Sequence, residues 1–203
     1  FATEKFIEMG AKVLTLSDSS GFIHDPAGIN KDKLKYVMQL KNEQRGRISE
    51  YEKKYPKAKF FAKDKPWKVA CDIAIPCATE NELSQSDAKN LIKNGVIAVA
   101  EGANMPCTPE AIRAFQNSKV LYAPGKASNA GGVAVSGLEM AQNSLKNTWS
   151  RKIVDGKLQE IMTDIHSSCL DYGKEKNHID YLKGANIAGF VKVADAMLAQ
   201  GVV

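Results

Sequence analysis

Residues 84–123, SQSDAKNLIKNGVIAVAEGANMPCTPEAIRAFQNSKVLYA, alternate helical patterns with short apolar runs. Ser84 with Asp87 resembles a capping box, in which a hydroxyl and an acid close the first turn of a helix. Residues 96–100 and 120–122 predict two buried strands, because both runs are short and apolar. Helices that alternate with short buried strands predict a parallel α/β sheet, and connections this short favour a doubly wound layer.

The same alternation extends outward along the chain. Thr108 followed by a proline and Glu110 predicts a helix start, because a capping hydroxyl precedes an acid at the positive end of the helix dipole. Residues 12–16 and 72–75 predict two more strands. Further helices are expected at 1–9, 30–44, 47–55, 130–149, 151–172 and 184–200. We therefore expect an α/β fold: a Rossmann-like doubly wound sheet with helices on both faces, truncated at the N-terminus, plus C-terminal helices.

Composition excludes several classes of protein. The chain has 203 residues, of which 44% are hydrophobic, and no apolar run reaches the roughly 18 residues of a membrane-spanning helix, so no membrane association is expected. It opens inside a helical pattern without an initiator methionine or a signal peptide, so we expect a piece of a longer protein. We expect that protein in the cytoplasm, with an organelle as the alternative. Four cysteines without CxxC spacing predict free, buried thiols, and three scattered histidines predict no metal site.

The net charge of +5 is concentrated in one stretch. Residues 30–68 hold 13 Lys plus Arg against 5 Asp plus Glu, so the rest of the chain is slightly acidic. No stacking aromatic residues are regularly interleaved with these charges, which argues against a nucleic-acid partner. A solvated basic face and a site for a phosphate-sized anion both remain open.

Small polar loops follow the predicted strands: SDSSG (17–21), PCATENEL (76–83), EGANMP (101–106) and PGKASNAGG (124–132). Parallel sheets bind ligands at the loops that leave the carboxyl ends of their strands, so the four loops predict a nucleotide-sized crevice. The glycine-rich GxGxxG turn that should precede the first helix is missing. We interpret this as truncation, because the predicted strands and loops after it all follow in the expected order.

Asp18 ends the first predicted strand, where a Rossmann domain reads the adenosine ribose. An aspartate there usually favours the 2′-hydroxyl of NAD. Here Ser19 and a second serine follow, and a basic helix carries Lys41, Arg45 and Arg47. Hydroxyls with nearby cations suit a 2′-phosphate, provided that the fold brings them together. The alternative is an Asp-Ser turn beside an ordinary basic helix.

Polar residues also mark the later loops. Thr79 and Asn104 follow strands directly, where a hydroxyl and an amide can bind a ribose or a carboxamide. Asn129 opens a helix, so its alternative role is an N-cap. Ser136 lies about two helical turns later and could face the same cleft, or its hydroxyl could bond back to the helix backbone. We interpret Lys126 as structural.

At these loops the sequence resembles a known family. SDSSG, PCATENEL, AVAEGANMP, APGKASNAGGVAVSGLEMAQN and GANIAGFVKVADAMLAQG together resemble the glutamate dehydrogenases, hexameric bacterial-type enzymes that usually use NADP. The resemblance covers the cofactor-binding half, and in that family the preceding half supplies the catalytic lysine and aspartate, so no catalytic residue is expected in this chain. It implies a dinucleotide-binding domain at 1–180 and, at 181–203, a helix that returns to the substrate domain.

The resemblance also implies roles for individual residues. The adenosine end of the cofactor would be bound by Asp18 and Ser19, with Lys41 and Arg47 as candidates for the 2′-phosphate. The rest of the dinucleotide would be bound by Ala78, Thr79, Gly102, Ala103, Asn104 and, at the carboxamide, Asn129. Glutamate would contact Val133 and, through its side-chain carboxylate, Ser136.

The expected function is therefore part of an NADP-dependent glutamate dehydrogenase, with NAD less favoured, that reversibly deaminates L-glutamate to 2-oxoglutarate and ammonia as a homo-hexamer. The alternative is a catalytically inactive fragment that binds dinucleotide or assembles with other subunits. A weaker alternative is a nucleic-acid binder that uses the basic stretch at 30–68.

Overall fold

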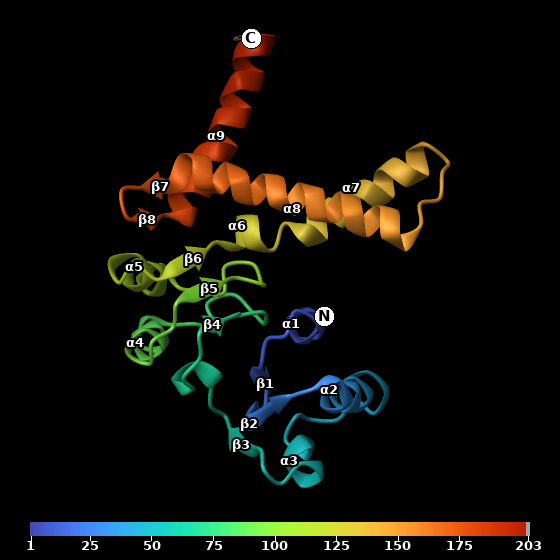
Figure 1. Ribbon diagram of the computed structural model, residues 1–203, viewed down its shortest axis with the longest axis vertical. Helices are drawn as coiled ribbons and strands as arrows, with labels where there is room; N and C mark the ends of the chain where they lie inside the picture. The colour runs from blue at the N-terminus through green and yellow to red at the C-terminus, as the bar shows by residue number, and fades with distance from the viewer. Residues whose placement is uncertain (202–203) are drawn as a thin grey trace. The chain divides into compact units, whose positions relative to one another are not determined.

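The computed structural model describes residues 1–201. Residues 202–203, which end the predicted segment 181–203, lie outside the described residues. The chain divides into two compact units, of which the first is Phe1–Cys71 and the second begins at Asp72. Figure 1 labels the helices and strands of each unit.

An antiparallel sheet forms the centre of the first unit. Strands β1 (Val13–Asp18), β2 (Gly21–Ile29) and β3 (Lys59–Ala62) pair in the order β1-β2-β3. Asp18 pairs with Gly21, so SDSSG is a tight hairpin turn. This corrects one expectation: among the described residues β1 pairs with β2, not with the parallel strands. Strand β2 itself was not predicted from the sequence.

Short helices pack against this sheet. The first unit contains α1 (Ala2–Glu8), α2 (Lys31–Met38), the π-helical turn η1 (Gln39–Glu43), α3 (Glu50–Lys54) and the 3-10 turn η2 (Pro66–Lys68). Asn30 caps α2 by accepting a hydrogen bond from the backbone N–H of Lys33 at 3.0 Å, as an N-cap should. The helix predicted at 30–44 is thus present, as α2 followed by the wider π-helical turn η1. Of the helix predicted at 47–55, only the residues of α3 are helical.

A buried carboxylate lies within this unit. Asp25 on β2 is 1% exposed, and it accepts hydrogen bonds from Lys33 Nζ at 2.6 Å, the Tyr51 hydroxyl at 2.8 Å and the Ala27 backbone at 3.1 Å. Ile23, on the same strand, belongs to the surrounding apolar core. Burial alone would raise the pKa of Asp25, but the bonds from Lys33 and Tyr51 outweigh it and lower that pKa.

The second unit contains the parallel sheet that the sequence predicted. Strands β4 (Ile73–Ala74), β5 (Ala98–Ala100) and β6 (Leu121–Ala123) pair in that order, and both pairings are parallel. Helices α4 (Gln85–Lys93) and α5 (Pro109–Asn117) connect them and pack on each other. The predicted capping box at Ser84 and the predicted cap at Thr108 are both present. The α/β prediction is therefore confirmed.

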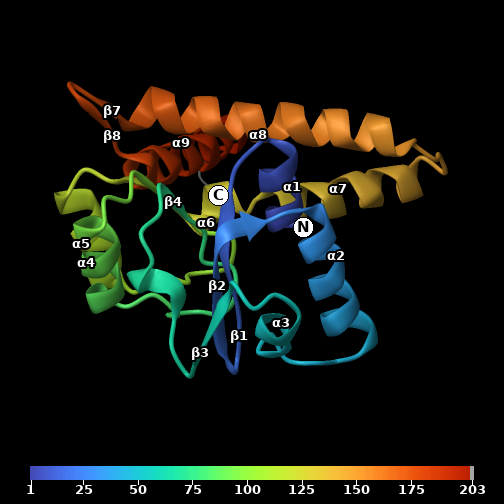
Figure 2. The ribbon, with the colours of Figure 1, turned by 60° about the horizontal axis from the view of Figure 1, so that its bottom comes forward.

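Helices dominate the rest of this unit. They are α6 (Gly125–Ser128), α7 (Gly131–Ser144), α8 (Arg151–Gly173) and, after the small hairpin β7 (Lys174–Glu175) and β8 (His178–Ile179), α9 (Tyr181–Gln200). Figure 2 shows α7 and α8 side by side. Gly184 of α9 lies directly on the backbone of Cys169, where a Cβ would clash with the carbonyl oxygen, so only glycine permits this crossing.

Three further observations bear on the sequence predictions. Cys107 and Cys169 are buried as expected, but Cys71 is only half-buried and Cys77 is exposed. In residues 1–201 no helix is long and apolar enough to cross a membrane. The same described residues hold no cluster of His, Cys, Asp or Glu that could bind a metal ion.

Candidate functional site

The loops that follow β4, β5 and β6 lie at one edge of the parallel sheet, because the three strands run in the same direction. Three of the four predicted crevice loops, 76–83, 101–106 and 124–132, are therefore neighbours in the second unit. The fourth, SDSSG, is the β1–β2 hairpin of the first unit. The predicted crevice loops are thus divided between the two units.

Asn129 joins two of these loops. Its side-chain Nδ2 donates to the carbonyl oxygen of Ala103 at 3.1 Å and to Oδ1 of Asn104 at 2.8 Å. A carbonyl oxygen can only accept, so this contact fixes which way the Asn129 amide faces. The Oδ1 atom of Asn129 is then the acceptor of that side chain, and it suits the NH₂ group of a carboxamide. Asn129 also ends α6 rather than capping α7, whose N-cap is Ala130.

The loop backbone approaches its neighbours closely at Gly102. The N–H groups of Gly102 and Ala103 donate to the carbonyl of Pro76 at 2.9 and 3.2 Å, which ties the loop after β5 to the loop after β4. A Cβ at Gly102 would clash with the Cys77 thiol. The Ala78 N–H donates to Glu82 at 2.8 Å. Thr79 is exposed.

The predicted glutamate residues lie on α7. Val133 is 78% exposed, and Ser136 is exposed as well. The Ser136 hydroxyl donates to the backbone carbonyl of Gly132 at 3.2 Å, which is the back-bonded alternative that the sequence left open. Lys126, interpreted as structural, donates to Asn186 Oδ1 at 2.6 Å and so links α6 to α9.

The part of the site in the first unit is a charged cluster around Asp18. Its Oδ2 accepts from Lys41 Nζ at 2.7 Å and from the Ile48 N–H at 2.9 Å. Next to it, Arg47 Nη1 donates to the Ser19 hydroxyl at 2.7 Å. The fold therefore does bring together the four residues that the sequence nominated, although Asp18 and Arg47 are 29 positions apart in the chain.

Asp18 is charged within this cluster. Its side chain is 12% exposed, and burial alone would raise its pKa. Hydrogen bonds from Lys41, from the Ser20 hydroxyl and from the backbone of Ile48 outweigh burial and hold the pKa of Asp18 well below its usual range. Arg47 and Ser19 are exposed, so a cation and a hydroxyl stay accessible beside this anchored carboxylate.

Sequence reasoning missed two contributors to these sites. In the first unit, the backbone carbonyl of Gly46 accepts from Lys41 at 3.0 Å and helps to aim its ammonium group. In the second, Glu101 is only 4% exposed and accepts hydrogen bonds from Cys107, directly after EGANMP, and from Gly125 in PGKASNAGG. The one available signal for Glu101 was an acid at the end of an apolar strand.

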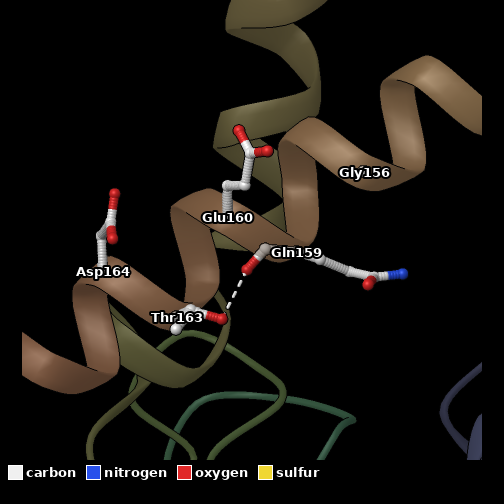
Figure 3. Close-up of a pocket in the computed structure, with 5 residues that line it drawn as sticks. All are labelled: Gly156, Gln159, Glu160, Thr163 and Asp164. Atoms are coloured by element: carbon white, nitrogen blue, oxygen red, sulfur yellow. Dashed lines mark hydrogen bonds between the residues drawn. The ribbon is translucent and has the colours of Figure 1, made fainter.

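A depression on α8 is not a competing site. It is lined by Gly156, Gln159, Glu160, Thr163 and Asp164, which all come from one helix (Figure 3). The Thr163 hydroxyl donates to the backbone carbonyl of Gln159 at 2.8 Å, so it is engaged within the helix. None of these residues belongs to the predicted crevice loops.

Comparison with known proteins agrees with the geometry. A family described as Glutamate/Leucine/Phenylalanine/Valine dehydrogenase matches residues 1–201. The chain is 59% identical to the glutamate dehydrogenase of Bacteroides thetaiotaomicron and 53% identical to the NADP-specific glutamate dehydrogenase of Escherichia coli; each match covers 100% of this chain and 46% or 45% of the relative. Other relatives of similar identity are named NADP-specific, NAD(P)-specific or NAD-specific.

The fold matches as well. The crystal structure of Plasmodium falciparum glutamate dehydrogenase superposes with a TM-score of 0.93 at 48% identity, over 100% of this chain and 44% of that one. The chain thus spans about half the length of the curated relatives it matches. The resemblance inferred from the sequence is confirmed: the chain belongs to the Glutamate/Leucine/Phenylalanine/Valine dehydrogenase family.

Proposed function

We propose that this chain is the cofactor-binding part of an NADP-dependent glutamate dehydrogenase, which interconverts L-glutamate with 2-oxoglutarate and ammonia. The observation that carries the proposal is the Asn129 amide, which its contacts with Ala103 and Asn104 hold in one orientation at the edge of the parallel sheet. Relatives at 53–59% identity that are named glutamate dehydrogenases support the choice of substrate within the family.

In each unit, considered by itself, the candidate residues suit one end of a phosphorylated dinucleotide. In the second unit, Asn129 Oδ1 would accept from the carboxamide. Gly102, where a side chain would clash with the Cys77 thiol, would border the nicotinamide ribose through its backbone. Ala78, Thr79, Ala103 and Asn104 would border the same end. When bound, the nicotinamide supplies hydride exchange with the substrate.

The first unit fits the adenosine end. Both oxygens of Asp18 already accept hydrogen bonds from the protein, so this carboxylate is less available to the 2′-hydroxyl of NAD than an unengaged aspartate. Lys41 and Arg47 offer positive charge beside it, and Ser19 offers a hydroxyl, which together suit a 2′-phosphate. We therefore propose NADP, with NAD less favoured.

Assembly is proposed from the resemblance and from exposed apolar residues. Helix α7 has no buried residue, and α9 exposes Phe190, Val193, Met197 and Leu198 at 60–77%. Apolar surface of this extent is typical of faces that other protein covers. We propose a homo-hexamer in the cytoplasm, in which the segment 181–203 returns to a substrate domain.

Full-length protein tests the function directly. We expect NADPH to be oxidised when 2-oxoglutarate and ammonium are both present, and NADH to be oxidised more slowly. Cofactor binding without turnover would favour the alternative of an inactive binding fragment. Binding of neither cofactor would contradict the proposal.

Replacing Ser136 by alanine tests the substrate assignment. If its hydroxyl binds the side-chain carboxylate of glutamate, Ser136→Ala should raise the KM for glutamate and for 2-oxoglutarate about tenfold, because one charge-assisted hydrogen bond is lost. The affinity for NADPH should not change. Ser144→Ala on the same helix is the matched control. Unchanged substrate KM values in Ser136→Ala would remove this residue from the site.

A further inference from the structure

Glu101 is buried but has no role in the function proposed above. With Asp25, it is one of the two buried charged side chains among residues 1–201, and it is 4% exposed. It follows β5 directly and begins the loop EGANMP. Charged side chains are seldom buried unless their partners justify it, so its contacts decide what it does.

The two carboxyl oxygens of Glu101 bind different loops. Oε1 accepts from the backbone N–H of Cys107 at 3.2 Å, at the end of its own loop. Oε2 accepts from the backbone N–H of Gly125 at 2.7 Å, in the loop that follows β6. The carboxyl group therefore bridges its own segment and a second segment that begins 24 positions after Glu101 in the chain.

Side chains complete the bridge. Burial raises the pKa of the Tyr122 hydroxyl, and the nearby Glu101 carboxylate raises it further, so this hydroxyl stays protonated. Burial and the charge of Glu101 also raise the pKa of the Cys107 thiol, which likewise stays protonated. The backbone carbonyl of Glu101 accepts from the Ser128 hydroxyl at 2.6 Å.

The loops that Glu101 joins are the ones that Asn129 joins at its contacts with Ala103 and Asn104. They approach so closely that a Cβ at Gly125 would lie 2.8 Å from the Ala103 carbonyl oxygen and 3.2 Å from Glu101 Oε2. The distance between the two loops, and with it the position of the Asn129 amide, therefore depends on the bridge beneath them.

We propose that Glu101 is a positioning residue for the nicotinamide end of the cofactor. By accepting one backbone N–H from each loop, it sets the spacing at which Gly102, Asn104 and Asn129 are presented. It contacts no cofactor itself. This inference rests on the proposed function and deepens it, because it names the group that holds the nicotinamide side of the site in shape.

Replacing Glu101 by glutamine breaks the bridge but keeps the size of the side chain. A glutamine has one acceptor oxygen, and its NH₂ group would face either the Cys107 N–H or the Gly125 N–H, donor against donor. One loop is then released, and a buried N–H loses its partner. We expect Glu101→Gln to raise the Kd for NADPH about tenfold through this loss.

The experiment compares two ligands on the full-length protein. NADPH carries the nicotinamide, whereas adenosine 2′,5′-bisphosphate carries only the adenosine end. For Glu101→Gln we expect the Kd of NADPH to rise about tenfold and that of adenosine 2′,5′-bisphosphate to stay within about twofold. Glu110→Gln, an exposed acid paired with Arg113, is the matched control and should change neither value.

Each outcome decides the question. Unchanged NADPH affinity in Glu101→Gln overturns the inference, as does an equal loss for both ligands, which indicates general damage. Wild-type protein that binds neither NADPH nor NADH overturns the proposed function, and the inference with it. If Glu101→Gln does not fold, Gly125→Ala separates the same loops by its added methyl group, and it must show the same contrast between the ligands.

Discussion

The double variant Lys41→Ala with Arg47→Ala should lose about 100-fold in affinity for NADPH, because two charge-assisted hydrogen bonds of about 1.5 kcal/mol each are removed. For NADH, which has no 2′-phosphate, we expect a loss below about threefold. Binding titrations with both cofactors on the full-length protein measure the ratio. A large effect is expected because the two cations converge on one turn, Lys41 through Asp18 and Arg47 through Ser19.

A charge-matched control separates local contacts from the general field of the basic stretch. Lys53→Ala with Lys57→Ala removes the same two charges from exposed positions in the same unit. Long-range attraction of a phosphorylated ligand would weaken equally in both double variants and would fall with added salt. Equal losses of NADPH and NADH in the Lys41/Arg47 variant would show that the 2′-phosphate does not bind there.

Local signals in the sequence were sufficient for most of the second unit. Ser84 and Thr108 cap their helices as predicted, because capping depends on residues within one turn. The short strands between these helices run parallel, since each connection is a helix that returns the chain to the same edge. The position of the crevice loops at one edge of this sheet follows from the alternation of strands and helices along the chain.

The first unit was harder to predict. Strand β2 contains Pro26 and Gly28 within GFIHDPAGI, and both residue types are unusual in strands, so the segment does not read as one. It exists because β1 and β3 pair with it on either side. The antiparallel pairing of β1 follows from the two-residue turn at Ser19, which the sequence showed only as a polar loop.

The residues of the candidate site were nominated one by one from the sequence, but the residues that hold its loops in place were not. Asp18 could be nominated because an aspartate suits a ribose hydroxyl, and Lys41 because a cation suits a phosphate; the structure places Lys41 Nζ 2.7 Å from Asp18 Oδ2. The bridge made by Glu101 joins backbone groups, which carry no sequence signal. The ligand contacts of Asn129 and Ser136 remain predictions, since they depend on molecules that the chain has yet to be shown to bind.

The buried pair in the first unit gives the largest expected effect on stability. Lys33→Ala would leave Asp25 buried with only the Tyr51 hydroxyl and the Ala27 N–H as named partners. Removing one partner of a buried ion pair costs about 3 kcal/mol, because the remaining charge is poorly compensated. Amide hydrogen exchange of β2 and α3 should then be about 150-fold faster, and it reports on this unit whatever the assembly state.

The stability that the Asp25–Lys33 pair contributes depends on pH. The folded-state pKa of Asp25 is lowered, so its pair with Lys33 stabilises the unit above the unfolded pKa of about 3.9, and the stabilisation is lost as the pH falls through the lower folded value. In Lys33→Ala the uncompensated carboxyl group of Asp25 protonates more readily. The difference in amide exchange rate between the variant and the wild type should therefore become smaller as the pH is lowered. Lys35→Ala, exposed on the same helix, should differ from wild type by less than about 0.5 kcal/mol. A gap of constant size down to acid pH would mean that Lys33 stabilises the unit by packing rather than by charge.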